Sequence, residues 1–256
     1  MQMERASRSA RDQVRWTLSD LLGVALLTLT LAAGMLLLLR LPALAGLPIA
    51  ALARQRPLLV GMILGGLIYL GALLATELLI VRRGRGSWRA IGFRAPPLLL
   101  LLLTPLIFAG QLTALLLVNA LLLLLGRFEN PQIDALTDPG GFAWSNFVAV
   151  FVVGALIAPI VEETLFRGLL YQWLRQRVGV IAAVLLSAAL FALAHYLDPR
   201  ILPLLPALFV VGVILALAFE WAHSLWVPIA LHCMQNALGI CGIFYLQAHP
   251  ELLRTA

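Results

Sequence analysis

Long hydrophobic runs separated by short polar stretches dominate this chain from end to end. Charge-free runs cover 21–39 and 98–126, and each is long enough to cross roughly 30 Å of hydrocarbon as a helix. We expect crossings near 19–40, 58–81, 97–126, 145–170, 179–197, 201–220 and 225–246. The sequence therefore predicts an all-α fold, a polytopic transmembrane helix bundle of about 7–8 helices.

Two features leave the number of crossings open. The run 97–126 is long enough to be tilted, kinked at Pro105 or split in two, and a split would add an eighth segment. The first run follows an Arg-rich stretch and precedes Ala43-Leu44-Ala45, which resembles the cleavage site of a secretory signal. Because this run is long for a signal and Arg40 intervenes, we expect a retained first helix rather than a cleaved one.

Polar stretches divide the chain into four parts. We expect a basic cytoplasmic segment at 1–18, helices and loops at 19–144, a second helical unit at 145–246 and a short tail at 247–256. Within the second part, 82–96 mixes arginine with aromatic residues and suits either an interfacial segment or a solvated loop. The polar stretch 127–144 is either a lid over an opening or an ordinary loop.

Composition agrees with a bilayer as the solvent, because 62% of the 256 residues are hydrophobic and only 12% are charged. The net charge of +6 comes from arginine alone, since the sequence contains no lysine. The arginine clusters lie beside hydrophobic runs, where the positive-inside rule explains them and places the N-terminus inside. We therefore expect a multi-pass protein of the cell membrane, in contact with lipid, and no nucleic-acid partner.

Ionisable side chains inside a membrane segment are costly unless they are paired or hydrated, so each one is a candidate for function. The stretch APIVEETLFRG carries three of them, Glu162, Glu163 and Arg167. The i,i+4 spacing of Glu163 and Arg167 allows an ion pair within one helix. That pair leaves Glu162, rotated by about 100°, free to face another helix.

Two later runs carry the remaining candidates. His195 ends SAALFALAHY, and His232 and Asn236 share one helix face in LHCMQN. Counted from an expected turn at 178–179, Glu162 and His195 each lie about 24 Å along their helices, so a folded-back hairpin sets them level. His232 lies closer to the turn that precedes its own helix. For the three side chains to meet, the hairpin that carries Glu162 and His195 must therefore extend further into water.

The residue types indicate hydrolytic chemistry. Glu162 and His195 are suited to hold a water and take its proton, and His232 with Asn236 to donate hydrogen bonds to a tetrahedral intermediate. Glu162, His195 and His232 could instead bind zinc, with water in the fourth position. The sequence has neither HExxH nor a GxSxG-type serine, which argues against zincin-type and serine-hydrolase sites. The alternative is a non-catalytic scaffold, immunity factor or transporter that keeps these groups for packing.

These residues resemble the motifs of the CPBP (Abi) family of intramembrane peptidases, which includes type II CAAX prenyl endopeptidase-like and lysostaphin resistance protein A-like members. The resemblance covers roughly 145–246, and the first three crossings show only the hydrophobic pattern. Its motifs stand here as Glu162-Glu163-x-x-x-Arg167, Phe191-x-x-x-His195 and His232-x-x-x-Asn236.

The resemblance implies a helix bundle around an interior polar chamber that opens to one leaflet and one aqueous face. It implies that Glu162 and His195 activate water, that His232 and Asn236 form the oxyanion hole, and that the ion pair of the first motif shapes the site. The implied substrate is a membrane-associated peptide or protein, prenylated CAAX-type tails included. The family is often called metallopeptidase, yet a metal-free glutamate mechanism has been inferred for members, so zinc and no cofactor both stay open.

Overall fold

The computed structural model describes residues 14–40, 48–126, 130–137, 141–196 and 198–254. Every regular element within these ranges is a helix, which confirms the all-α prediction. The expectation for Ala43-Leu44-Ala45, and most of that for 1–18, lie outside the described residues.

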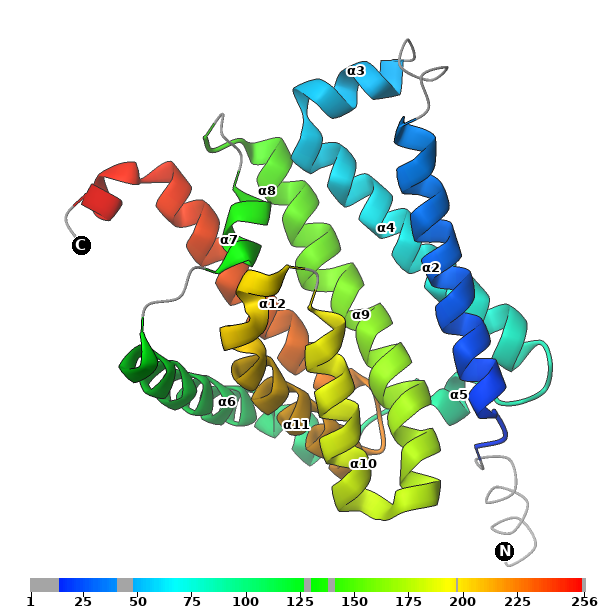
Figure 1. The fold of residues 1–256 in the computed structure, drawn as a ribbon. Helices are drawn as coiled ribbons and strands as arrows, with labels where there is room; N and C mark the ends of the chain where they lie inside the picture. Colours follow the sequence, from blue (N-terminus) through cyan, green and yellow to red (C-terminus); the bar gives the residue numbers. More distant parts are fainter. Residues whose placement is uncertain (1–13, 41–47, 127–129, 138–140, 197, 255–256) are drawn as a thin grey trace, which may run out of the picture.

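Long apolar helices form the body of the molecule (Figure 1). Among the described residues, six helices are long and apolar enough to cross a membrane, namely Leu18–Leu38, Pro57–Val81, Leu98–Leu125, Trp144–Ala194, Pro199–Ala222 and Trp226–Ala248. The outermost of them expose rows of leucine, as expected of helices whose solvent is lipid. The chain is therefore an integral membrane protein.

The fourth of these helices is a hairpin. It comprises α8 (Trp144–Val150), the π-helical η3 (Phe151–Ile157), α9 (Ala158–Glu163), the π-helical η4 (Thr164–Tyr171) and α10 (Gln172–Ala194). The chain doubles back at Gly179, whose φ of 77° is a conformation that favours glycine (Figure 1). The turn lies where the sequence predicts it, although the first limb continues past the expected end at 170 as far as this glycine.

The remaining long helices pack against this hairpin or against one another. They are α2 (Leu18–Arg40), α4 (Pro57–Thr76) with its π-helical end η2 (Glu77–Val81), α6 (Leu98–Leu125), α11 (Leu205–Ala222) and α12 (Trp226–Ala248). Figure 1 shows α6 at the edge of the bundle, next to α11 and α12. Because α6 runs unbroken through Pro105, the split considered for this run does not occur.

Short helices occupy the connections, the start of the crossing expected at 201–220 and the expected tail. They are α3 (Pro48–Gln55), α5 (Trp88–Ile91), α7 (Pro131–Leu136), η5 (Pro199–Leu204) and η6 (Pro250–Arg254). In α5, the Ser87 side chain caps the first turn by accepting a hydrogen bond from the Ala90 amide. The ring of Phe93 then packs edge-on between Trp88 and Trp226, which fixes this segment against the start of α12.

Helices α10 and α11 pack closely against each other. A Cβ atom added at Gly212 would lie 2.9 Å from the Cα atom of Ala188, so only glycine fits there without a shift of the backbone. The same glycine offers its carbonyl oxygen to a buried side chain of the candidate site. This contact therefore links the packing of the bundle to its chemistry.

Candidate active site

The helix that carries the two glutamates changes its pitch on both sides of them. Pro159 lies buried inside the limb, where it cannot donate a backbone hydrogen bond and its ring displaces the carbonyl one turn earlier. The wide turns of η3 end just before this proline, and those of η4 begin just after Glu163. Such wide turns rotate the side chains that follow and are frequent at functional sites.

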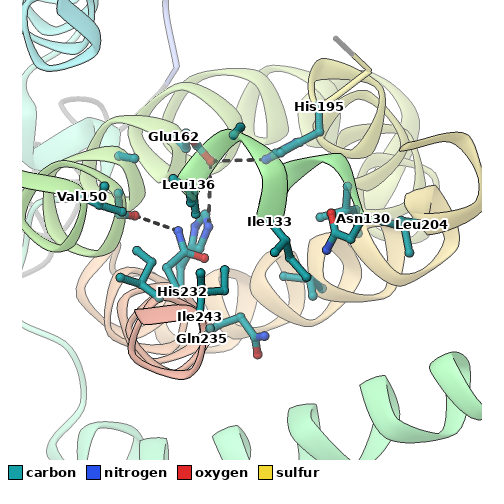
Figure 2. Close-up of a pocket in the computed structure, with 18 of the residues that line it drawn as sticks. Asn130, Ile133, Leu136, Val150, Glu162, His195, Leu204, His232, Gln235 and Ile243 are labelled. Atoms are coloured by element: carbon teal, nitrogen blue, oxygen red, sulfur yellow. Dashed lines mark hydrogen bonds and ion pairs between the residues drawn. The ribbon is translucent and has the colours of Figure 1, made fainter. Parts of the chain in front are cut away.

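Glu162 lies at the meeting point of three other segments. Its Oε1 atom accepts a hydrogen bond from the Tyr69 hydroxyl at 2.9 Å. Its Oε2 atom lies 4.0 Å from His195 Nε2 and 3.9 Å from His232 Nε2. Figure 2 shows the three labelled side chains of Glu162, His195 and His232 pointing toward one another. The hairpin geometry expected from the sequence, with Glu162 and His195 level, is confirmed.

His195 lies at the C-terminal end of α10, and its ring orientation is fixed by its own helix. Its Nδ1 atom lies 2.8 Å from the carbonyl oxygen of Phe191, and its ring packs on the Phe191 ring at 4.8 Å. Because a carbonyl oxygen only accepts, Nδ1 carries a proton, and in the neutral ring Nε2 then presents a lone pair toward Glu162. A carboxylate oxygen and a nitrogen lone pair therefore face the same space.

The second glutamate belongs to a fully buried network. Glu163 and Arg167 have no exposed side-chain surface, and Arg167 Nη1 donates to Glu163 Oε1 at 2.7 Å, which confirms the predicted ion pair. The same oxygen lies 2.9 Å from His232 Nδ1. Arg167 also donates to the Gly212 carbonyl at 3.0 Å and lies 4.5 Å from the centre of the Phe191 ring. The network holds His232 with Nε2 toward Glu162.

Asn236 takes a position that the sequence did not predict. Its side-chain nitrogen donates to the carbonyl oxygen of Gly154 at 2.9 Å, which ties α12 to η3. The side chain also lines the same cavity as Glu162 and His232. One amide proton therefore serves the packing of two helices, and no described contact uses the second.

A cavity of about 620 Å³ contains these polar groups. Aliphatic and small side chains from α4, α9, α11 and α12 form most of its wall, and Gln235 and Asn119 add further polar groups. Asn130 and three residues of α7 (Ile133, Ala135 and Leu136) also line it, and Figure 2 shows Ile133 and Leu136 beside the site. Of the two expectations for 127–144, a lid or an ordinary loop, this placement favours a lid that covers the cavity.

A metal ion would need three or more donor side chains at bonding distance from one point. Among the described ranges, no group of three or more His, Cys, Asp and Glu side chains is placed to hold a metal ion. The separations of 3.9 and 4.0 Å exceed the roughly 3.3 Å edge expected of a tetrahedral zinc site with bonds of about 2.0–2.1 Å. The Glu162, His195 and His232 side chains thus do not fit zinc as they stand.

One member of the site was missed at the sequence level. Tyr69 belongs to α4, outside every motif, and contacts Glu162 directly. A hydroxyl in an apolar crossing was the available signal, but only the folded chain shows which partner it meets. Gln111 of α6 was missed as well, and its amide donates to Gln235 of α12 at 3.2 Å.

Comparison with known proteins gives matches that cover part of the chain. Residues 144–238 match the family described as type II CAAX prenyl endopeptidase Rce1-like. The chain is 36% identical over 115 residues to the membrane-embedded CAAX protease MroQ of Staphylococcus aureus (strain USA300), with 43% of each chain covered. It is 30% identical over 91 residues to the "Putative membrane peptidase YdiL" of Bacillus subtilis (strain 168), with 36% of each chain covered.

These similarities concern part of each protein. The chain spans less than half the length of the curated relatives that it matches. No solved structure matches it. The matched region contains all seven named residues of the three motifs, from Glu162 to Asn236, and excludes α4 with Tyr69.

Proposed function

We propose that this chain, whose residues 144–238 match the Rce1-like family, is an intramembrane endopeptidase that uses water held between Glu162 and His195. The match supports a protease. The observation that carries the proposal is the meeting of Glu162, His195 and His232, which come from three separate helices, around one cavity.

The first step is the activation of water. A water between Glu162 Oε2 and His195 Nε2 donates one hydrogen bond to each, because both atoms are acceptors and their 4.0 Å separation leaves room for a bridging oxygen. As this oxygen attacks the peptide carbonyl carbon, its proton passes to Glu162. Closing the cavity around the peptide strengthens these interactions by excluding bulk water.

The second step is the stabilisation of the tetrahedral oxyanion. His232 donates through Nδ1 to Glu163, so its Nε2 atom faces the cavity and donates to the oxyanion when the ring is in the imidazolium form, with both nitrogens protonated. The amide proton of Asn236 that is not bound to Gly154 serves as the second donor. Collapse of the intermediate breaks the C–N bond, and the proton taken up by Glu162 passes to the leaving amine.

The substrate that fits this arrangement is a membrane-associated or lipid-modified protein or peptide tail. The cavity wall is mostly apolar and carries the polar groups of the candidate site, which suits an extended tail whose side chains or lipid lie against aliphatic walls. MroQ is described as a CAAX protease, and we extend that substrate class, prenylated tails included, to this chain. We place the protein in the cell membrane.

Reconstituted protein tests the proposal. Wild type, Glu162→Ala and His195→Ala are assayed in liposomes against a panel of internally quenched membrane peptides with and without a farnesylated cysteine. Wild type is expected to cleave members of the panel, and both variants are expected to lose at least about 100-fold in kcat. Wild-type rates in either variant, or a panel that wild type leaves intact, would contradict the proposal and favour a non-catalytic scaffold.

A further inference from the structure

One polar contact to Glu162 comes from outside the region that the family match covers. Tyr69 belongs to α4, and its hydroxyl donates to Glu162 Oε1 at 2.9 Å. Met62, Gly65 and Tyr69 all line the cavity, and their spacing of three and four residues places them on one face of α4. The tyrosine therefore lies within the chamber rather than at a distant helix contact.

The two oxygens of Glu162 have different surroundings. Oε1 is occupied by the Tyr69 hydroxyl, whereas Oε2 faces the Nε2 atoms of His195 and His232 at 4.0 and 3.9 Å. A carboxylate on a two-carbon stem rotates freely unless one of its oxygens is held. The hydroxyl fixes this rotation, so a single oxygen is presented to the space between the two histidines.

The neighbouring glutamate shows the same arrangement with different donors. Glu163 Oε1 is held by Arg167 and His232, so each of the two glutamates has one oxygen fixed from a different helix. Glu162 receives no donor from its own helix among the described contacts of its side chain. Its orientation therefore depends on α4.

We propose that Tyr69 is a positioning residue of the active site, whose hydroxyl aims Glu162 Oε2 at the attacking water. This inference rests on the function proposed above, because the water and the histidines are those of the peptidase mechanism. It assigns to the N-terminal half of the chain a part in catalysis beyond that of a hydrophobic scaffold.

The matched pair Tyr69→Phe and Tyr245→Phe tests the assignment in the liposome assay with the quenched peptides. Each variant removes one hydroxyl and keeps the ring, and Tyr245 is an exposed tyrosine of α12, 58% accessible. We expect Tyr69→Phe to lower kcat by about 10- to 100-fold with KM within twofold, since a hydrogen bond to a charged group is lost from an atom that does not touch the peptide. Tyr245→Phe is expected to match wild type. Rates are referred to the folded fraction measured by size exclusion, so a folding defect cannot imitate a loss of kcat.

A double-mutant cycle separates positioning through Glu162 from a purely structural role. Glu162→Asp keeps the carboxylate but withdraws it from the hydroxyl by one methylene, so adding Tyr69→Phe to it is expected to change kcat less than threefold. The same 10- to 100-fold loss in both backgrounds would overturn the assignment. An unchanged kcat in Tyr69→Phe, with Glu162→Ala inactive, would also overturn the assignment. Full activity in Glu162→Ala would instead overturn the proposed function itself.

Discussion

Replacing Arg167 by methionine separates the structural role of the buried network from its chemical one. Arg167 and Glu163 are both fully buried and joined at 2.7 Å. Methionine fills similar space without charge, so Arg167→Met leaves the Glu163 carboxylate with His232 as its only hydrogen-bonding partner among the described side chains. Breaking a buried pair in this way costs about 3–5 kcal/mol, because one charge is left uncompensated.

The expected loss is large enough to measure in detergent. At about 2–4 °C per kcal/mol for a chain of this size, Arg167→Met is expected to lower the melting temperature by about 6–20 °C. Thermal unfolding followed by size exclusion after heating gives this value. The loss of the hydrogen bond to Gly212 and of the contact with Phe191 acts in the same direction.

The double variant Glu163→Gln/Arg167→Met is the control. It removes both charges together, so most of the lost stability is expected to return, to within a few degrees of wild type. The amide oxygen still accepts from His232, and peptide cleavage is therefore expected to recover to within about tenfold. A double variant that is as unstable as Arg167→Met alone would refute the idea that an uncompensated buried charge is the cause.

Three further predictions concern packing, the cover and metal. Gly212→Ala is expected to lower the free energy of unfolding by about 1–3 kcal/mol, because the new Cβ atom would meet the Ala188 backbone at 2.9 Å. Gly242→Ala, whose Cβ atom would have nothing within 4 Å, is expected to be neutral or stabilising. Equal melting temperatures for the two variants would contradict this packing argument. Arg200→Ala removes the 2.9 Å ion pair to Asp134 of α7 and is expected to raise KM severalfold with kcat unchanged. An unchanged KM would argue against α7 as a cover of the cavity. Purified protein is expected to contain no stoichiometric zinc and to keep its cleavage rate in strong chelator; bound zinc with chelator-sensitive cleavage would reject the metal-free mechanism.

The pH dependence expected for the contact of α7 follows from the ion pairs of Arg200 with Asp134 and Asp198. Hydrogen bonds from Arg200 hold the pKa of Asp198 below its usual range, so this exposed carboxylate stays charged at neutral pH. A carboxylate whose pKa is lower in the folded state stabilises the folded form at pH values above its unfolded pKa. This stabilisation is lost as the pH falls through the folded-state pKa. KM is therefore expected to stay constant between pH 6 and 8, and a rise within this window would point to a different group.

The sequence predicted those parts of the site that depend on local spacing. Glu163 and Arg167 stand one helical turn apart and form an ion pair, and the equal distances of Glu162 and His195 from the turn place them level. Periodicity along one helix and a turn at Gly179 suffice for both results.

The remaining features depend on contacts between helices that are distant in the sequence. Tyr69 meets Glu162 across 93 positions, and Asn236 meets Gly154 across 82. Hydropathy in a membrane segment does not specify which helix faces which, since lipid and neighbouring helices are equally apolar. The π-helical turns beside Pro159 add a rotation that a regular helical wheel does not contain.

The central claim is that Glu162 and His195 direct water onto a peptide bond. Cleavage of a quenched membrane peptide in water enriched in oxygen-18, followed by mass spectrometry of the new carboxyl terminus, tests it most directly. We predict that wild type places one heavy oxygen in this carboxylate and that Glu162→Gln yields no product above background. Equal labelled product from Glu162→Gln and wild type, or no cleavage by wild type, would contradict the claim.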